Sequence, residues 1–328
     1  MSDRAAQIAS FLVQAGWDEA EIFPFGADFS SRRYARLVRD DARAILMDAD
    51  PNQKTDEFIL IGQYLREIGL SAPEIYAGDP DNGLVLEDDF GGRNIGGLFD
   101  AGEETLPYYR RAVDVLVHLH KNFDRAAVRE LDVPIFGGAL FAAQAELFLD
   151  YYLPHVLGRE ATHDEGESFR AAWKVALKGI DALPQVLMLR DFMPDNLMDL
   201  PGRAGVKGIG LLDFQDGGLG PVAYDLTSLC ECVRRDSDAK LLDDMIAYYH
   251  GRAQPALSLE DLRRACRILS AQRHMRILGI VAKLAQQGRP EKRAYIPRIR
   301  AYLGELLQDE ALAPVAAWAA PILGYNKI

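Results

Sequence analysis

Residues 186–229 read VLMLRDFMPDNLMDLPGRAGVKGIGLLDFQDGGLGPVAYDLTSL, and this stretch decides the fold of the chain. Asp191 is followed five positions later by Asn196, and after a polar turn an apolar strand delivers Asp213. Transfer of a phosphoryl group needs a carboxylate near the attacking hydroxyl and hard oxygen ligands that hold Mg²⁺ against phosphates. These three side chains meet that need, so the stretch predicts a metal and phosphate site.

Composition limits the size and the class of the fold. The chain has 328 residues, of which 49% are hydrophobic. This hydrophobic content is enough to bury a sizeable core, and the length suggests two domains or one large bilobal domain. The three cysteines, Cys230, Cys232 and Cys266, are too few for a disulfide framework, and Cys-Glu-Cys is not a usual zinc spacing. We therefore expect buried free thiols.

Charge and hydropathy exclude two kinds of partner. The net charge of −12 argues against non-specific binding of nucleic acid, which needs a basic surface. No apolar run approaches the roughly 20 residues that span a bilayer, and the first residues lack the basic start and long apolar centre of a signal peptide. The sequence predicts a cytoplasmic protein without a nucleic-acid or membrane partner, and we infer no obligate protein partner.

The first 88 residues predict an antiparallel sheet with one main helix. The β-like segments cover about residues 21–25, 33–39, 42–49, 74–77 and 83–87. A short amphipathic helix precedes them at 5–15, and a longer one at 54–68 carries its apolar residues on one face and ends at Gly69.

The turn of residues 26–31 joins the first two predicted strands. It lies where a loop that covers phosphates would lie, so Gly26, Ser30 and Ser31 are candidate nucleotide ligands. A hairpin turn without any ligand would read the same way.

The acidic, glycine-containing segment 87–92 breaks the strand pattern as a linker would, and the sequence after Arg93 is nearly all helical. We predict an α+β fold of two lobes. Residues 1–88 form a nucleotide-binding lobe, and residues 89–328 form a helical lobe that carries the catalytic loop, the metal site and the acceptor pocket.

This order of features resembles the protein-kinase-like fold of the aminoglycoside phosphotransferase and choline kinase family, over essentially the whole chain. The segments RDFMPDNLM, LLDFQDGGLGPVAYDLTSL and ELFLDYYL are similar to one branch of that family. The branch consists of bacterial amino-sugar kinases that phosphorylate N-acetylmuramate and N-acetylglucosamine at the anomeric carbon.

The resemblance implies a role for each residue of the central motif. Asp191 would accept or orient the proton of the attacking hydroxyl, and Asn196 and Asp213 would ligate Mg²⁺. Asp225 would hold the catalytic loop in place through backbone N–H groups. The linker residues Glu87 and Asp89 would offer main-chain groups to the adenine of ATP.

Two positions depart from the family pattern. Leu189 stands where the catalytic loop usually begins with His, and Met47 stands where a strand Lys grips phosphate. A thioether cannot grip phosphate, so a neighbouring cation has to serve. The cations available in the preceding segment are Arg32, Arg33 and Arg36, with Arg33 among the candidate nucleotide ligands.

Glu57, on the helix that follows the third strand, could orient such an arginine, although a solvated surface position is an equal reading of it. The acceptor side has three further candidates, Glu146, Asp150 and Gln215. The first two lie on an aromatic-rich helix that core packing would also explain.

The sequence therefore predicts an ATP- and Mg²⁺-dependent kinase that phosphorylates a hydroxyl of a small-molecule sugar, with an N-acetylated amino sugar of cell-wall recycling as the preferred acceptor. One alternative is an aminoglycoside-type phosphotransferase. Another is a non-catalytic, kinase-like nucleotide-binding protein, which Leu189 and Met47 would favour. A protein substrate is disfavoured, because no long activation loop follows Asp213.

Overall fold

The computed structural model describes residues 3–25, 32–50, 53–238 and 240–325. The chain groups into two compact units. Unit 1 consists of Met1–Val133 with Leu189–Gly217, and unit 2 of Pro134–Met188 with Gly218–Ile328. This grouping does not test the lobe boundary expected between residues 88 and 89, which stays a prediction.

Unit 1 combines a five-stranded sheet with helices and a small hairpin. Its elements are α1 (Asp3–Gln14), β1 (Glu21–Phe25), β2 (Arg33–Arg39), β3 (Ala42–Asp48), α2 (Thr55–Glu67), β4 (Ile75–Asp79), η1 (Pro80–Asn82), β5 (Leu84–Asp88), α3 (Ile95–Asp100), α4 (Leu106–Lys121), α5 (Arg125–Glu130), η4 (Pro194–Asn196), β7 (Leu197–Asp199), η5 (Gly205–Gly208) and β8 (Ile209–Leu211). The sheet has the order β1-β2-β3-β5-β4, and neighbouring strands are antiparallel. The predicted meander is thus confirmed.

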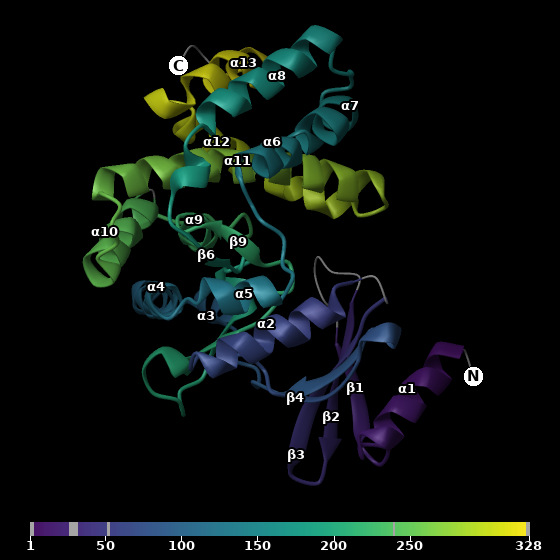
Figure 1. Ribbon diagram of the computed structural model, residues 1–328. Coiled ribbons are helices and arrows are strands. Elements are labelled where there is room, and N and C mark those ends of the chain that lie inside the picture. The colour runs from purple at the N-terminus through teal and green to yellow at the C-terminus, as the bar shows by residue number, and fades with distance from the viewer. Residues whose placement is uncertain (1–2, 26–31, 51–52, 239, 326–328) are drawn as a thin grey trace. The chain divides into compact units, whose positions relative to one another are not determined.

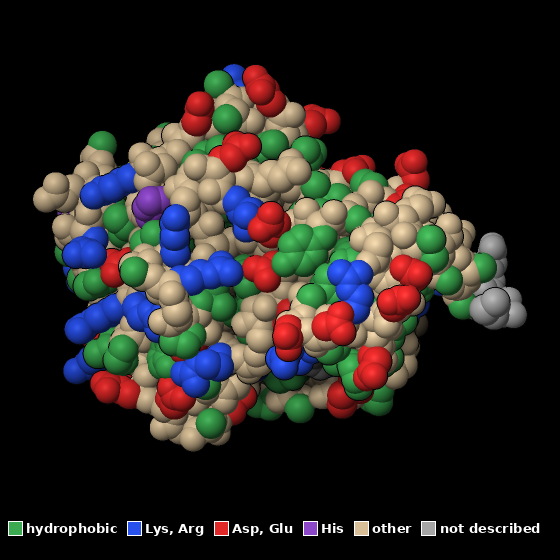
Figure 2. Space-filling model, turned by 90° about the horizontal axis from the view of Figure 1, so that it is seen from below, with side chains coloured by type: hydrophobic (Ala, Val, Ile, Leu, Met, Phe, Trp, Pro, Cys, Tyr) green, Lys and Arg blue, Asp and Glu red, His purple; other side chains and the backbone are tan. Residues whose placement is uncertain are grey.

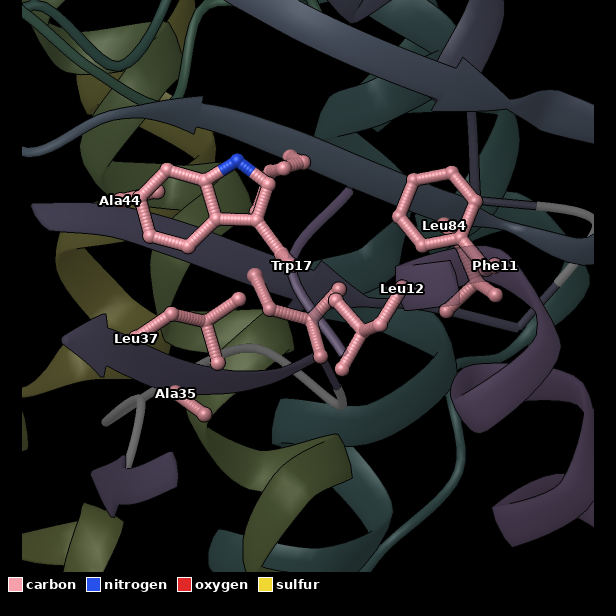
Figure 3. Close-up of a cluster of buried hydrophobic side chains, with 9 residues drawn as sticks. Phe11, Leu12, Trp17, Ala35, Leu37, Ala44 and Leu84 are labelled. Atoms are coloured by element: carbon pink, nitrogen blue, oxygen red, sulfur yellow. The ribbon is translucent and has the colours of Figure 1, made fainter. Parts of the chain in front are cut away.

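The register of the sheet separates two faces, because directly opposed residues of neighbouring strands point to the same side. One face, here called the α1 face, packs on α1, which lies beside β1 in Figure 1. Figure 3 shows the core on this face. Large apolar residues of the N-terminal segment, Phe11, Leu12 and Trp17, pack there on residues of the strands, Ala35, Leu37, Ala44 and Leu84. We call the opposite face, which carries Tyr34, Met47 and Glu87, the site face.

Helix α2 connects the sheet to the segment that carries Asp213. Its buried Phe58 stacks on Phe214, with ring centroids 4.8 Å apart and planes 2° apart. Gly62 lets that ring approach, since a Cβ built on it would lie 3.3 Å from Phe214. The helix predicted at 54–68 is confirmed as Thr55–Glu67, and Gly69, at φ +87°, follows directly after the residue that caps it, Ile68.

The hairpin of β7 and β8 positions the central motif. Leu197 pairs with Leu211, so Asn196, just before β7, and Asp213, just after β8, meet at the same end of the hairpin. The other end is fixed by Asp199, whose carboxylate accepts hydrogen bonds from Arg93 and Arg111. The two candidate metal ligands therefore depend on backbone pairing for their proximity.

Unit 2 is mostly helical. Its elements are α6 (Gly138–Ala145), the π-helix η2 (Phe148–Tyr152), α7 (Leu153–Val156), α8 (His163–Ala176), η3 (Ile180–Ala182), β6 (Gln185–Met188), β9 (Gly218–Pro221), α9 (Tyr224–Cys230), α10 (Leu241–Ala253), α11 (Leu259–Gln286), η6 (Pro290–Tyr295), α12 (Ile296–Leu306), η7 (Glu310–Leu312) and α13 (Ala313–Leu323). Helix α11 lies at its centre, and Gly279 is required there because a Cβ would come within 2.3 Å of the Leu147 backbone. All three cysteines are free and buried, as predicted.

In the described part of the chain, no helix is both long and apolar enough to cross a bilayer. On the face shown in Figure 2, acidic side chains lie among basic and hydrophobic ones.

Candidate active site

Two residues of the central motif have backbone conformations that side chains rarely adopt. Arg190, next to Asp191, has φ +64°, and Asp213 has φ +57°. Left-handed conformations of residues other than glycine cost energy and concentrate where a functional geometry demands them. Both segments that the sequence selects contain such a residue, although left-handed residues other than glycine also occur elsewhere in the described chain.

The structure brings the predicted catalytic and metal-binding residues together within unit 1. The Asn196 side-chain amide donates a hydrogen bond to the main-chain oxygen of Asp191 at 2.8 Å and lies 3.4 Å from Oδ2 of Asp213. Gln215 donates a hydrogen bond to Oδ1 of Asp213 at 2.9 Å, and its predicted acceptor-side role stays a prediction. Gln215 thus orients a candidate metal ligand.

The electrostatics of this cluster favour a bound cation. Asp213 keeps 38% of its side chain exposed, yet the surrounding protein raises its pKa by desolvation, and the negative charge of Asp191 raises it further. A divalent cation between such groups would remove that penalty. The described residues contain no group of three or more His, Cys, Asp or Glu side chains that could enclose a metal by themselves. Two oxygen ligands, the Asp213 carboxylate and the Asn196 amide oxygen, suit Mg²⁺, which takes its other ligands from water and phosphate.

The arginines of the β2 segment have different partners. Arg32 is 8% exposed, and its guanidinium lies 3.2 Å from Oδ1 of Asp213 and donates to the main-chain oxygen of Gln53 at 2.7 Å. Arg33 projects to the α1 face, where it pairs with Asp48 at 2.7 Å. Arg32 is therefore the arginine that the structure brings to the metal ligands.

The third arginine, Arg36, binds the Asp89 carboxylate with two hydrogen bonds of 2.6 and 3.0 Å. Asp89 also accepts a hydrogen bond from the main-chain N–H of Gly91 at 2.8 Å. The side chain of Asp89 thus shapes the linker, which leaves its main chain for the predicted contact with a base.

Lys54 is a cation that the sequence analysis missed. Its ammonium group lies 2.8 Å from Asp216, three residues after Asp213. Burial raises the pKa of Asp216, but the hydrogen bond and charge of Lys54, with the charges of Arg190 and Arg32, together outweigh burial and keep the pKa below its ordinary value. The available signal was a lysine just before α2, the helix that carries the stacking partner of Phe214.

The remaining nucleotide candidates are less defined. Glu57 lies in the first turn of α2 and is partly exposed, and Met47 is fully buried on the site face. Gly26, Ser30 and Ser31 lie outside the described residues. Their roles stay predictions.

Three candidates belong to unit 2. Glu146 pairs with Arg170 at 3.4 Å, Asp150 is exposed within the π-helix, and Asp225 is buried in the first turn of α9. Nothing in unit 2 by itself tests an acceptor role for Glu146 and Asp150 or a loop-holding role for Asp225.

Comparison with solved structures identifies the fold. The chain resembles a choline/ethanolamine kinase family protein from Mesorhizobium loti, with a TM-score of 0.66 at 17% identity over 97% of this chain and 98% of the other. It also resembles APH(2")-IIa in complex with gentamicin, with a TM-score of 0.60 at 14% identity over 94% and 97%. These similarities confirm the predicted α+β, protein-kinase-like fold.

Comparison with characterised sequences identifies the family. Residues 21–269 match the model of the phosphotransferase enzyme family, APH. The chain is 29% identical to an N-acetylmuramate/N-acetylglucosamine kinase of Caulobacter vibrioides, over 97% of this chain and 96% of that one. It is 31% identical to a protein of the same name from Pseudomonas aeruginosa, over 90% and 87%. The chain therefore belongs to the phosphotransferase enzyme family and is a kinase.

Proposed function

We propose that this enzyme transfers the γ-phosphoryl group of ATP to a hydroxyl of an N-acetylated amino sugar, in a reaction that needs Mg²⁺. The observation that carries the proposal is the cluster of Asp191, Asn196 and Asp213 at one end of the β7–β8 hairpin. The names of the relatives that align over nearly the whole chain support the acceptor, N-acetylmuramate or N-acetylglucosamine. The family resemblance of the sequence suggests the anomeric hydroxyl as the attacking group.

Each residue of the cluster would have one task. Asp191 would accept the proton of the attacking hydroxyl as its oxygen bonds to the γ-phosphorus and the bond from that phosphorus to the ADP oxygen breaks. Asp213 and Asn196 would hold Mg²⁺, which neutralises charge on the phosphate oxygens. Arg32 would add a second positive charge beside Asp213, in place of the strand lysine that Met47 replaces.

Hydrogen bonds from neighbouring groups would keep these residues in position before ATP binds. Gln215 fixes one oxygen of Asp213, and the Asn196 amide is held by the Asp191 backbone. Preorganised polar groups stabilise a transition state without reorganising at the moment of reaction. The hydrogen bonds inside the cluster are of that kind.

A substrate panel tests the proposal. Purified protein would be given MgATP with N-acetylmuramate, N-acetylglucosamine, kanamycin or choline, and ADP release would be measured with a coupled assay. We expect turnover with at least one N-acetylated amino sugar and almost none in Asp191→Asn. Asp195→Asn, which removes a carboxylate from the same loop, serves as the matched control and should stay active.

The other outcomes separate the alternatives. Turnover of kanamycin alone would identify an aminoglycoside-type phosphotransferase. ADP release no faster than that of Asp191→Asn with every acceptor, together with thermal stabilisation by ATP that does not need Mg²⁺, would indicate a non-catalytic nucleotide-binding protein.

A further inference from the structure

Glu87 is a buried acid on the site face of the sheet. Glu87 is 4% exposed. In the sheet it lies opposite Ile45 of β3, and Ile45 lies opposite Arg36 of β2. The neighbouring residues of the same strand, Leu84 and Leu86, are part of the core on the α1 face. A carboxyl group therefore occupies a position in the sheet interior where an apolar side chain would pack.

The carboxyl group of Glu87 is incompletely satisfied. Its Oε2 is buried and meets no hydrogen-bonding partner among the described residues. Burial above all, and the charge of Asp88 next, raise the pKa of Glu87 to about 8, against the opposing charge of Arg32. At neutral pH the group is mostly the uncharged acid, which presents one O–H donor beside one carbonyl acceptor. An unsatisfied buried polar group costs free energy, so a natural chain keeps one where it serves a purpose.

The sheet register places the backbone of Glu87 at a different level along the strands from that of Arg32, which marks the phosphate end of the site. Arg32, which reaches Asp213, precedes Arg36 by four residues, or about 13 Å of strand. Glu87 is level with Arg36 across β3. An extended nucleotide whose phosphates lie at Arg32 and Asp213 can place its base at that level. Strand β5 also ends there, at the start of the linker.

We propose that the side chain of Glu87 hydrogen-bonds directly to the nucleobase of the phosphoryl donor, at an edge where the base presents a donor and an acceptor side by side. This inference rests on the proposed function, because it needs a bound nucleotide. It adds a side-chain contact to the main-chain contacts expected from the linker. Adenine and guanine both present such an edge, so binding of each is part of the test.

A purely structural role makes the opposite prediction. If Glu87 only fills space, an apolar side chain of similar length should stabilise the fold and leave nucleotide binding unchanged, because replacing a buried polar group by a well-packed apolar one is often stabilising. If Glu87 contacts the base, the same change should leave the fold as stable or more stable and weaken nucleotide binding.

The experiment uses the full chain and measures binding in place of turnover. Binding of MgADP, MgGDP and magnesium pyrophosphate would be titrated calorimetrically in the parent, Glu87→Gln and Glu87→Met, and the melting temperature of each would be recorded without ligand. Leu86→Met, on the same strand but on the α1 face, is the control.

We expect Glu87→Met to bind the preferred nucleoside diphosphate about tenfold more weakly, the equivalent of one good hydrogen bond at 1.4 kcal/mol per factor of ten. Its melting temperature and its affinity for pyrophosphate, which has no base, should not fall. Glu87→Gln keeps a donor and an acceptor and should bind within about threefold of the parent, and Leu86→Met should match the parent.

Four results would overturn the inference. The first is Glu87→Met with parental affinity for both diphosphates, and the second is equal losses for pyrophosphate and for the diphosphates. If Glu87→Met melts early, Glu87→Gln decides, and the third result is a loss of affinity in Glu87→Gln as large as that in Glu87→Met, which would exclude recognition through the donor and acceptor pair. The fourth is a parent that binds neither diphosphate. It would refute the proposed function as well, whereas the first three would leave it intact.

Discussion

Arg32 and Arg33 are adjacent in sequence and opposite in position, which allows a sharp test of the site. Arg32→Met removes a guanidinium that is 3.2 Å from Asp213 and largely buried, while leaving a side chain of similar bulk. If Arg32 takes the place of the strand lysine, the variant loses a charged donor that acts on the phosphates in the transition state. Removal of one such donor costs about 10²–10³ in rate, or roughly 3–4 kcal/mol. We therefore expect kcat/KM for MgATP to fall about 10²–10³-fold.

Arg33→Met is the matched control. Arg33 is 60% exposed, and its partner Asp48 keeps a second guanidinium, that of Arg4. Loss of an exposed ion pair costs about 0–1 kcal/mol of stability, so this variant should retain nearly parental kcat/KM and a small change in melting temperature.

Steady-state kinetics with varied MgATP at saturating amino sugar measures both variants. Two results would refute the reasoning. One is a kcat/KM of Arg32→Met within threefold of the parent value. The other is a kcat/KM of Arg33→Met as low as that of Arg32→Met while its melting temperature is unchanged.

Other substitutions test separate parts of the structure. Asn196→Ala removes an amide oxygen from the metal site, so the Mg²⁺ concentration for half-maximal activity should rise about tenfold or more; an unchanged requirement would exclude Asn196 as a ligand. Lys54→Met frees Asp216 from its 2.8 Å ion pair, so the pKa of Asp216 should rise. NMR titration of the carboxyl group would detect the rise. An unchanged pKa would show that the pair has no effect on Asp216. Glu165→Gln tests pH dependence in α8. Hydrogen bonds from Arg159 first and from the Thr162 backbone N–H next lower the pKa of Glu165 from 4.5 to about 2. Their stabilisation is therefore complete above about pH 4.5 and is lost as the pH falls toward 2. Urea unfolding should show the variant less stable at pH 7, with a difference that shrinks from pH 5 to pH 3; a constant difference would contradict the linkage.

Much of the fold could be predicted because the pattern of apolar residues reports on local structure directly. Alternation indicated the strands, and the 3.6-residue period with Gly69 indicated α2 and its end. The cluster at the hairpin was also predictable, because the spacing of Asp191, Asn196 and Asp213 reflects a catalytic loop followed by two paired strands. These features depend on short stretches of sequence.

The choice of cation could not be predicted in the same way. The alternation of side chains along a strand predicts that Arg32 and Arg33 point to opposite faces of the sheet. It does not predict which face carries the site, because that depends on which elements pack on each face. Helix α1 covers the face of Arg33 and supplies Arg4 to the ion pair with Asp48. Lys54 belongs to no sequence motif. Its pairing with Asp216 could not be predicted, because the two residues are 162 positions apart in the chain. Such contacts depend on tertiary packing.

The position of these cations gives a physical account of Met47. A strand lysine would have to extend from the interior of the sheet, where Met47 is fully buried. Arg32 and Lys54 instead lie in the segments that precede β2 and α2, and both reach the Asp213–Asp216 segment. The positive charge beside the metal ligands therefore comes from the residues just before β2 and α2. The interior of strand β3 can then hold an apolar side chain, Met47. The same sheet face also carries a buried acid, Glu87, at a position where packing alone would favour an apolar residue. The buried Met47 at the lysine position and the buried acid Glu87 both support the proposal that the site face binds its nucleotide through contacts arranged differently from those of a strand-lysine kinase.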